Sequence, residues 1–316
     1  MRKQDMSNTE YVKERTVDVV IPVYRPGNEL ERLLKRLSEQ KKKIGHIFLM
    51  HTEDGVDLGW TQKLCHNVQE YMVYPEEFDH GGTRDRGIRN SCADIVVCMT
   101  QDALPADREL IDALIRPFQG EGIVASYARQ LPRAECSLLE RCVREFNYPE
   151  RSRVKSAEDI KELGIKTFFC SNVCAAYDRE KYLALGGFEK KTIFNEDMIF
   201  AAHAVKNGYK IAYAAEAKVV HSHNYTNIQQ LKRNFDLAVS QAQHPEIFRA
   251  VKSESEGIRM VMRTFGRLVR SRHPLAAFEL ILQSGFKYLG YRLGKNYKKL
   301  PAWLILKFTM NPRYWK

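Results

Sequence analysis

Unbroken apolar runs of strand length, separated by helical segments, constrain the fold of this chain more than any other feature. Three such runs are VDVVIPVY at 17–24, HIFLM at 46–50 and DIVVCM at 94–99, and leucines recur at helical spacing over 30–37. Strands without polar alternation are buried on both faces, and strands that alternate with helices pair in parallel. The sequence therefore predicts an α/β fold with a Rossmann-like, mostly parallel sheet and helices on both faces.

The second half of the chain predicts further elements of the same domain. A helix is expected over 196–206, because acids open it and Asn207-Gly208 is a typical helix-ending pair. Two capping residues are also expected, Asn28 for the leucine-rich helix and Thr83 for a helix that follows a glycine turn. Further strands are expected at 123–127, 167–177 and 209–220.

Positive charge is concentrated at the C-terminal end. The chain has 50 Lys and Arg residues against 39 Asp and Glu, and from Gly257 onward thirteen basic residues stand against the single acid Glu279. In IRMVMRTFGRLVR at 258–270, an apolar stripe and regularly spaced arginines predict a basic amphipathic helix. Such a helix suits an anionic membrane surface, and the alternative is that it packs on the body of the protein. The stretch that follows is too charged for a membrane span.

These changes in composition divide the chain into three parts. We expect a flexible N-terminus at 1–15, an α/β domain at 16–245 and a basic amphipathic helical tail at 246–316. Seven cysteines without a tight pair indicate reduced thiols, and the polar residues after Met1 lack the apolar core of a signal peptide. We therefore expect a cytoplasmic protein that binds peripherally to the inner face of the plasma membrane.

Several classes of function lack their signatures. The sequence contains neither GxGxxG nor GxxxxGK[ST], so it supports neither a dinucleotide dehydrogenase nor a P-loop enzyme. The basic tail has the charge to attract nucleic acid, but zinc-ligand spacing and RNP-like aromatic patterns are missing. We therefore expect no nucleic-acid partner.

Asp102 follows directly after the buried run at 94–99, which places a carboxylate at the carboxyl edge of the predicted sheet. Ligands of open α/β sheets bind along that edge, where a carboxylate can hold a divalent cation against a diphosphate. An ordinary helix cap is the alternative. His221-Ser222-His223, at the end of the last predicted strand, could add an imidazole ligand, although isolated histidines are more often surface or packing residues.

Two further patterns fit the same kind of site. Glu196 and Asp197 open a helix, where acids complement the helix dipole or, if positioned, act as a general base. Gly81-Gly82 and Arg84 lie at a turn into another helix, where backbone amides and a guanidinium suit a phosphate.

The order of these motifs resembles glycosyltransferase family 2, whose members have the GT-A fold. VVIPVY, GGTRDRGI, an aspartate after a buried strand, and GGF followed by NED stand in the family's order. The longer phrases HGGTR, MTQDALP, ARQLP, GIKTFFCSN and AEAKVVHSHNYT are similar to its rhamnosyltransferase-like branch, which builds bacterial cell-surface polysaccharides. The likeness covers about 16–245.

The resemblance implies an inverting glycosyltransferase and assigns roles to individual residues. Asp197 matches the catalytic base, and Glu196 beside it would help to orient the acceptor. Asp102 matches the metal-binding acid and His221 a histidine that completes the metal shell, which implies a divalent cation, Mg²⁺ or Mn²⁺. Thr100 stands where the family has another acid, so strict metal dependence is not implied. The residues matched to the nucleotide-sugar site are Pro22, Val23, Tyr24, Glu53, Gly82, Arg84, Gln101 and Asp102.

The resemblance also implies the substrates. The donor would be dTDP-rhamnose and the acceptor a lipid-linked saccharide, which the basic segment 257–316 would approach at an anionic membrane surface. A UDP-hexose donor on the same fold is an open alternative. A catalytically silent protein that binds nucleotide sugars is another, because Thr100 and Asp85 depart from the family pattern.

Overall fold

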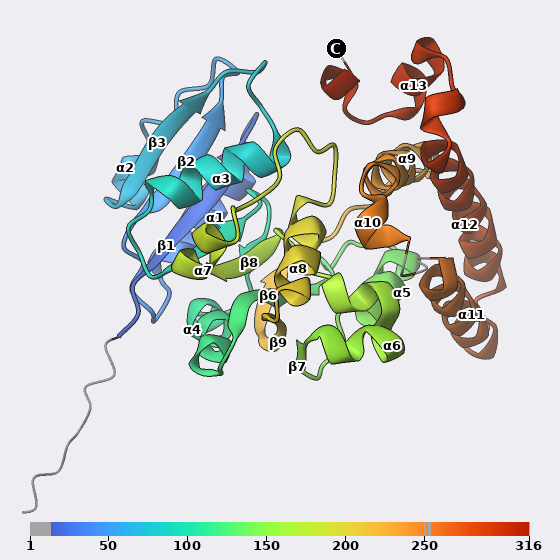
Figure 1. Cartoon of the computed structure of the whole chain (residues 1–316), viewed down its shortest axis with the longest axis horizontal. Coiled ribbons are helices and arrows are strands. Elements are labelled where there is room, and N and C mark those ends of the chain that lie inside the picture. The colour runs from blue at the N-terminus through green and yellow to red at the C-terminus, as the bar shows by residue number, and fades with distance from the viewer. Residues whose placement is uncertain (1–13, 250, 252–253, 316) are drawn as a thin grey trace, which may run out of the picture.

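The computed structural model describes residues 14–249, 251 and 254–315 (Figure 1). At its centre lies a nine-stranded mixed sheet in the order β3-β2-β1-β4-β8-β6-β9-β5, with β7 paired to β9. The strands are β1 (Val17–Val23), β2 (Ile47–Thr52), β3 (Val68–Val73), β4 (Ile95–Met99), β5 (Leu104–Pro105), β6 (Ile123–Leu131), β7 (Arg153–Lys155), β8 (Cys174–Asp178) and β9 (Lys210–Val220). The helices are α1 (Asn28–Ser38), α2 (Thr61–Leu64), α3 (His80–Asn90), α4 (Leu110–Ile115), α5 (Leu138–Asn147), α6 (Ile160–Leu163), α7 (Arg179–Ala184), α8 (Glu196–Lys206), α9 (Asn227–Gln243), α10 (Pro245–Phe248), α11 (Glu254–Arg270), α12 (Pro274–Lys295) and α13 (Ala302–Phe308).

The N-terminal half of the sheet is parallel, as predicted. β1 pairs with β2 on one side and β4 on the other, and β2 pairs with β3. Successive side chains of a strand point to opposite faces, and both faces are covered here. Val19 and Ile21 pack in the core that contains the leucines of α1, whereas Val20 packs with Ile88 of α3. Burial on both faces explains why the β1 sequence shows no polar alternation.

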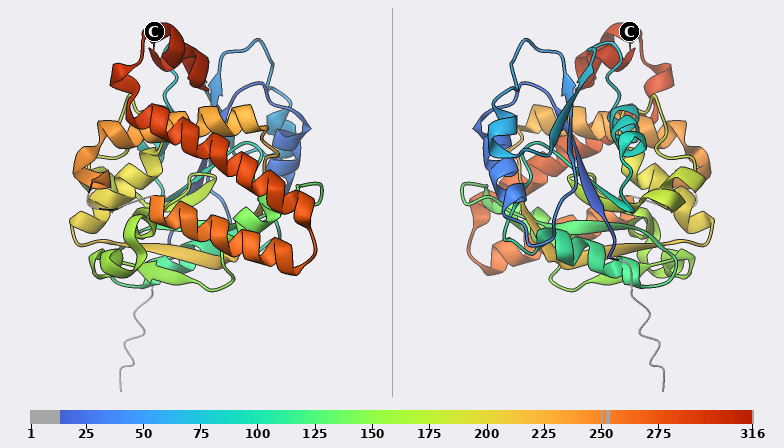
Figure 2. Two further views of the ribbon diagram at one scale, coloured as in Figure 1. Left: turned by 90° about the vertical axis from the view of Figure 1, so that its right-hand side faces the viewer. Right: turned by 90° about the vertical axis from the view of Figure 1, so that its left-hand side faces the viewer.

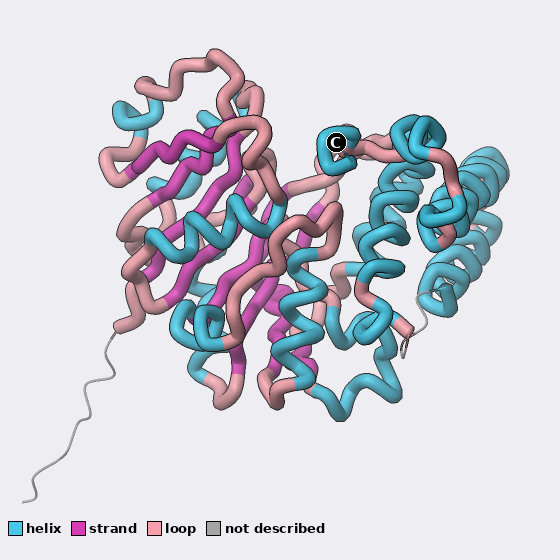
Figure 3. The backbone as a smooth tube through the Cα atoms, turned by 45° about the horizontal axis from the view of Figure 1, so that its top comes forward, coloured by secondary structure: helices cyan, strands magenta, loops and turns pink. Residues whose placement is uncertain are grey.

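Strand β8 reverses the direction of the sheet, because it runs antiparallel to both β4 and β6. Figure 3 shows the strands of the sheet side by side between helices. The strands β6 and β9 are again parallel to each other. The carboxyl ends of β1, β4, β6 and β9 therefore lie at the same edge as the amino end of β8. The strand expected at 167–177 is shorter than predicted, because Gly164–Phe168 forms a 3-10 turn before β8 begins.

The two predicted helix caps are wrong. The N-cap of α3 is Asp79, whose carboxylate accepts a hydrogen bond from the Gly82 N–H over 2.5 Å, so Thr83 lies inside the helix. Asn28 is the first residue of α1, and that helix has no side-chain cap. The N-cap therefore lies one residue before the expected position in α1 and four residues before it in α3.

The C-terminal helices pack on the rest of the molecule (Figure 2). α11 and α12 lie together on one side, and α12 crosses α9. Their closest approach is at Gly290 and Gly294, where an added Cβ would overlap the carbonyl oxygens of Leu231 and Phe235 in α9. Only glycine permits this contact, so the helical tail is held against the domain.

The division of the chain into three parts stays a prediction. Residues 1–13, which make up most of the expected flexible N-terminus, lie outside the described residues. The boundary expected after residue 245 falls inside α10, and the helices α9 and α12 on either side of it pack on each other. Within the described ranges, no helix is both long and apolar enough to cross a membrane.

Candidate active site

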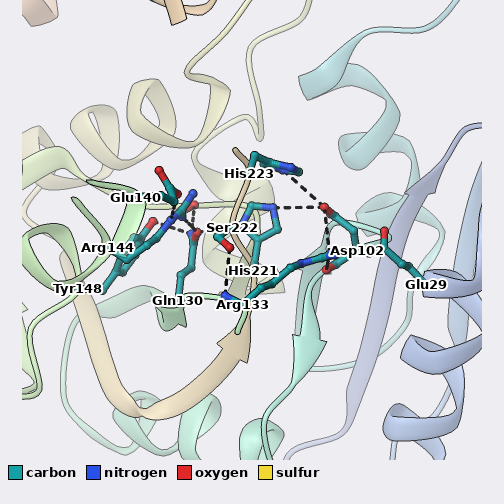
Figure 4. A network of polar contacts seen from close by, with 11 residues as sticks. Glu29, Asp102, Gln130, Arg133, Glu140, Arg144, Tyr148, His221, Ser222 and His223 are labelled. Atoms are coloured by element: carbon teal, nitrogen blue, oxygen red, sulfur yellow. Dashed lines mark hydrogen bonds and ion pairs between the residues drawn. The ribbon is translucent and has the colours of Figure 1, made fainter. Parts of the chain in front are cut away.

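The carboxyl edge of the sheet gathers polar residues from segments that are far apart in sequence. Asp102 follows β4, Gln130 lies near the end of β6, Asn172 precedes β8 and His221 follows β9. Asp102, Gln130 and His221 lie close together in Figure 4. Because β8 runs opposite to β4 and β6, its amino end brings Asn172 to the edge where β1, β4, β6 and β9 end.

Asp102, His221 and His223 form a group of possible metal ligands (Figure 4). Asp102 Oδ2 lies 3.5 Å from Nε2 of each histidine, and the three ligand atoms lie within 4.8 Å of one another. Arg133 donates to the Asp102 carbonyl oxygen over 3.1 Å and so holds this turn in place. The sequence predicts His221 as a metal ligand, and His223 joins it only in the structure. The HSH spacing could have indicated both, because residues two apart in an extended segment share a face.

The chemistry of these three groups fits a divalent cation. Burial, with His223 close by, holds the pKa of His221 well below its usual value. Burial also lowers the pKa of His223, although the Asp102 charge opposes this. Both imidazoles are therefore neutral near pH 7, the form that binds metal through a free lone pair. Thr100 adds no carboxylate, and its hydroxyl is buried without a hydrogen-bond partner among the described residues.

Glu196 and Asp197 open α8 at the same edge. Asn195 precedes them in the left-handed conformation, with φ of 67°, which asparagine tolerates better than most residues. Asn172, which the sequence analysis missed, joins the two acids. Its backbone N–H donates to Asp197 Oδ2 over 2.9 Å, and its side-chain Nδ2 donates to Glu196 Oε1 over 3.1 Å. The Met198 N–H donates to the other Asp197 oxygen over 2.8 Å.

These neighbouring carboxylates differ in charge state. Burial acts to raise the pKa of Glu196, but Arg84, 3.3 Å away, and His80 outweigh burial and hold it below its usual value. Burial and the charge of Glu196 raise the pKa of Asp197 to about 7. A carboxylate that exchanges a proton near neutral pH has the property required of a general base. The half-buried Asp197 has this property, and ionised Glu196 does not.

A chain of contacts connects the two ends of the site. The His221 ring is 3.1 Å from Gln130 Oε1, and Gln130 Nε2 donates to Ser171 Oγ over 3.0 Å. Asn172 follows Ser171, and its backbone N–H donates to Asp197 Oδ2. Asp102 and Asp197, although distant in sequence, therefore border one polar region at the sheet edge.

The end of β1 is fixed to the loop after β4. Tyr24 N–H donates to Gln101 Oε1 over 2.9 Å, and Gln101 Nε2 donates to the Tyr24 carbonyl oxygen over 3.0 Å. The Arg25 guanidinium lies 5.1 Å from the centre of the exposed Tyr24 ring. Val23 is buried and Pro22 is half-buried, so Tyr24 is the predicted strand-end residue with an accessible side chain.

Asp54 is built into the loop after β2, next to Glu53, whose contact with the nucleotide sugar stays a prediction. Its carboxylate accepts hydrogen bonds from the Arg25 N–H and from the Val56 N–H, the latter over 2.9 Å, and lies 3.0 Å from His51 Nε2. Burial acts to raise the pKa of Asp54, and these hydrogen bonds more than offset it. Glu53 is exposed, and within the described ranges its side chain forms no hydrogen bond or ion pair.

Gly82 and Arg84, from which phosphate contacts are expected, both form contacts inside the protein. The Gly82 N–H donates to Asp79, as described for the helix cap. The buried Arg84 donates to the His80 carbonyl oxygen over 2.9 Å and pairs with Glu196. The Arg84 guanidinium stabilises the ionised form of Glu196, and its Nε has no hydrogen-bond partner among the described residues. Phosphate binding by Gly82 and Arg84 stays a prediction.

Arg233 of α9 is a cation that the sequence analysis missed. Its guanidinium lies 4.8 Å from the centre of the Phe194 ring and 5.6 Å from that of Tyr225. Phe194 stands just before α8 and Tyr225 just after His223, so Arg233 bridges the two loops that carry the candidate base and metal ligands. In the part of the chain that the structure describes, Arg233 forms no ion pair with a carboxylate.

The chain is similar to known proteins over most of its length. Residues 18–186 match the family model described as glycosyl transferase family 2. The chain is 37% identical to the O-antigen chain rhamnosyltransferase WbaN of Salmonella anatum, over 94% of this chain and 95% of that protein. It is 36% identical to the O-antigen chain rhamnosyltransferase RfbN of Salmonella typhimurium, over 95% of this chain and 96% of that protein.

A solved structure shares the fold at low sequence identity. The mannosyltransferase PcManGT from Pyrobaculum calidifontis, in complex with GDP-Man and Mn²⁺, superposes with a TM-score of 0.62 at 14% identity. The match covers 92% of this chain and 89% of that one. At this identity the likeness concerns the fold alone, and it confirms the expected GT-A class.

Proposed function

The chain belongs to glycosyltransferase family 2, and from this membership we propose that it transfers rhamnose from dTDP-rhamnose, with inversion, to a lipid-linked saccharide. The product would be a growing bacterial surface polysaccharide. The observation that carries this proposal is that Asp197, with a pKa near 7, borders the same sheet edge as Asp102. The two rhamnosyltransferases that match nearly the whole chain support the choice of sugar.

Asp197 would act as the general base in this reaction. It would take the proton from the acceptor hydroxyl as that oxygen attacks the anomeric carbon and the nucleoside diphosphate leaves. One base on one face suffices for inversion, and no covalent intermediate is needed. Glu196, held ionised by Arg84 and bonded to Asn172, would orient the acceptor and keep the proton affinity of Asp197 high.

Asp102, His221 and His223 would hold a divalent cation, Mg²⁺ or Mn²⁺. When bound, this cation would supply positive charge against the leaving diphosphate. Tyr24 and Gln101, fixed by their reciprocal hydrogen bonds, would lie on the nucleoside side of the donor. Replacement of Asp102 by Ala should weaken Mn²⁺ binding and donor binding together in titration calorimetry, and unchanged Mn²⁺ affinity would contradict the assignment.

The donor is tested with a panel of nucleotide sugars. Full-length protein is incubated with dTDP-rhamnose, UDP-galactose, UDP-glucose or UDP-N-acetylglucosamine, and release of the nucleoside diphosphate and thermal stabilisation are measured. The proposal predicts that dTDP-rhamnose gives the greatest stabilisation and turnover. Turnover with a UDP-hexose alone would support the alternative donor. Stabilisation by a donor without turnover in the presence of a lipid-linked acceptor would support a silent binding protein.

The lipid-linked acceptor would be reached through a docking face on α11, α12 and α13. Large apolar side chains are exposed there, the most exposed being Leu275 at 84%. The same segment is strongly basic, and basic side chains near an anionic membrane contribute about 1 kcal/mol each. We therefore assign this face to the inner surface of the plasma membrane. Its exposed large hydrophobic residues are Ile258, Met262, Val269, Leu275, Phe278, Ile281, Leu282, Tyr288, Leu289, Trp303 and Leu306.

Matched methionines allow a test that keeps the chain intact. Met262 on the docking face is 68% exposed, and Met72 on β3 is 44% exposed. Met262→Glu should reduce co-sedimentation with vesicles that contain phosphatidylglycerol, whereas Met72→Glu should not. Equal binding of both variants and the unaltered protein would contradict the docking face. Equal loss in both variants would also contradict it, because the effect would then follow from charge alone.

A further inference from the structure

We propose that Gln130 is a positioning residue that fixes the ring of His221 so that its Nε2 is free to bind the cation. The inference rests on the cation site of the proposed function. Gln130 belongs to the phrase ARQLP, to which the sequence analysis gave no role. It is 2% exposed and lies in β6, next to the end of β9 where His221 begins the HSH segment.

The orientation of the Gln130 amide is set by its partners (Figure 4). Its Nε2 donates to the Tyr148 hydroxyl over 2.5 Å and to Ser171 Oγ over 3.0 Å, which uses both amide hydrogens. Its Oε1 accepts a hydrogen bond from the Arg144 guanidinium. Arg144 is in turn held by Glu140 over 2.6 Å, so the network is anchored in α5.

This orientation fixes the tautomer of His221. The His221 Nδ1 lies 3.1 Å from Gln130 Oε1, and a carbonyl oxygen can only accept a hydrogen bond. Nδ1 therefore carries the hydrogen, and Nε2 presents a lone pair. That lone pair faces Asp102 Oδ2 at 3.5 Å, so two acceptors confront each other without a hydrogen between them. A bound cation would satisfy both, and a histidine whose other ring nitrogen is held in this way is typical of metal sites.

The register of the sheet makes this contact possible. The pairing of β6 with β9 shifts between Ala128 and Arg129, and beyond the shift Gln130 is paired with Val219. The His221 N–H donates to the Leu131 carbonyl oxygen over 2.9 Å. The irregularity thus brings the Gln130 side chain beside the imidazole, as irregularities near active sites often re-aim a side chain.

Two substitutions separate positioning from packing. Gln130→Met keeps the size of the side chain but removes the acceptor for Nδ1. Gln130→Glu keeps an acceptor, and Arg144, Tyr148 and Ser171 can all donate to its carboxylate. If Gln130 only filled space, Met would be tolerated and a buried Glu would be harmful. The positioning role predicts the reverse order for metal binding.

The experiment measures Mn²⁺ binding to the full chain by electron paramagnetic resonance, without donor or acceptor. We expect Gln130→Met to weaken Mn²⁺ binding by about 10- to 100-fold. We expect Gln130→Glu to bind within about threefold of the unaltered protein and to keep the ¹⁴N coupling of a histidine ligand in pulsed spectra. Circular dichroism and Tm identify any variant that fails to fold. If only the Gln130→Glu variant folds, its spectrum tests the role of Gln130, because loss of the ¹⁴N coupling would overturn the inference.

The possible failures are distinguishable. Unchanged Mn²⁺ affinity in a folded Gln130→Met variant would overturn the role of Gln130 and leave the cation site intact. Absence of Mn²⁺ binding by the unaltered protein, with or without nucleoside diphosphate, would overturn the cation site itself and this inference with it. Loss of turnover alone supports neither conclusion, so activity is not the readout.

Discussion

The guanidinium of Arg84 lies 3.3 Å from the carboxylate of Glu196 beneath the first turn of α8. Both side chains are more than nine-tenths buried, so each charge is stabilised mainly by the other and not by water. The pair keeps Glu196 ionised, and the charge of Glu196 in turn raises the pKa of the neighbouring Asp197. One buried ion pair therefore sets which of the two acids can serve as the base.

Replacement of Arg84 by Met should destabilise the protein strongly, because it leaves the Glu196 charge buried without its partner. Breaking a buried pair in this way costs about 3–5 kcal/mol. The free energy of unfolding is measured in urea at pH 7. Arg86→Met, at an exposed position of the same helix, is the control and should change it by less than about 0.5 kcal/mol. Similar stability in both variants would show that the pair contributes little.

The pH dependence of transfer should report the pKa of Asp197. A general base acts in its deprotonated form, so turnover should rise with pH, change slope near pH 7 and level off above it. Below that point the rate should fall about tenfold for each pH unit. The pH profile of kcat/KM between 5.5 and 8.5 checks this, and a flat profile across this range would exclude Asp197 as the titrating base.

Asp197→Asn should abolish transfer and leave donor binding within a few fold, because it removes the proton acceptor but keeps the size of the side chain. A general base contributes about 10²–10⁴-fold to the rate. Turnover and donor affinity are measured on the same preparation. The assignment of the base fails if this variant retains more than a tenth of the original turnover.

Gly290→Ala should weaken the packing of α12 on α9, because its Cβ would overlap the Leu231 carbonyl oxygen. Overpacking of this kind costs about 1–3 kcal/mol. Gly285 lies on the same helix with nothing near its Cβ position. Gly285→Ala should therefore be neutral or stabilise by about 0.5–1 kcal/mol. Urea unfolding of both variants measures the difference, and equal effects would mean that close contact is not needed here.

Elements with local signals could be predicted from the amino-acid sequence. The apolar runs of β1 and β4, the leucine stripe of α1 and the extent of α8 follow from side-chain periodicity and from helix-ending residues. The position of Asp102 at the carboxyl edge followed because a strand and the turn after it are adjacent in sequence. The order of the motifs carried the family resemblance.

Features that depend on contacts between distant segments became visible only in the folded chain. The reversal of β8, the pairing of Arg84 with Glu196 and the contact of Gln130 with His221 join residues whose separation leaves no local pattern. Proton affinities belong to this group too, because burial and neighbouring charges set them only after folding. A sequence pattern can place an acid at the edge of a sheet, but the surrounding packed side chains determine whether it holds a metal, takes a proton or stays ionised.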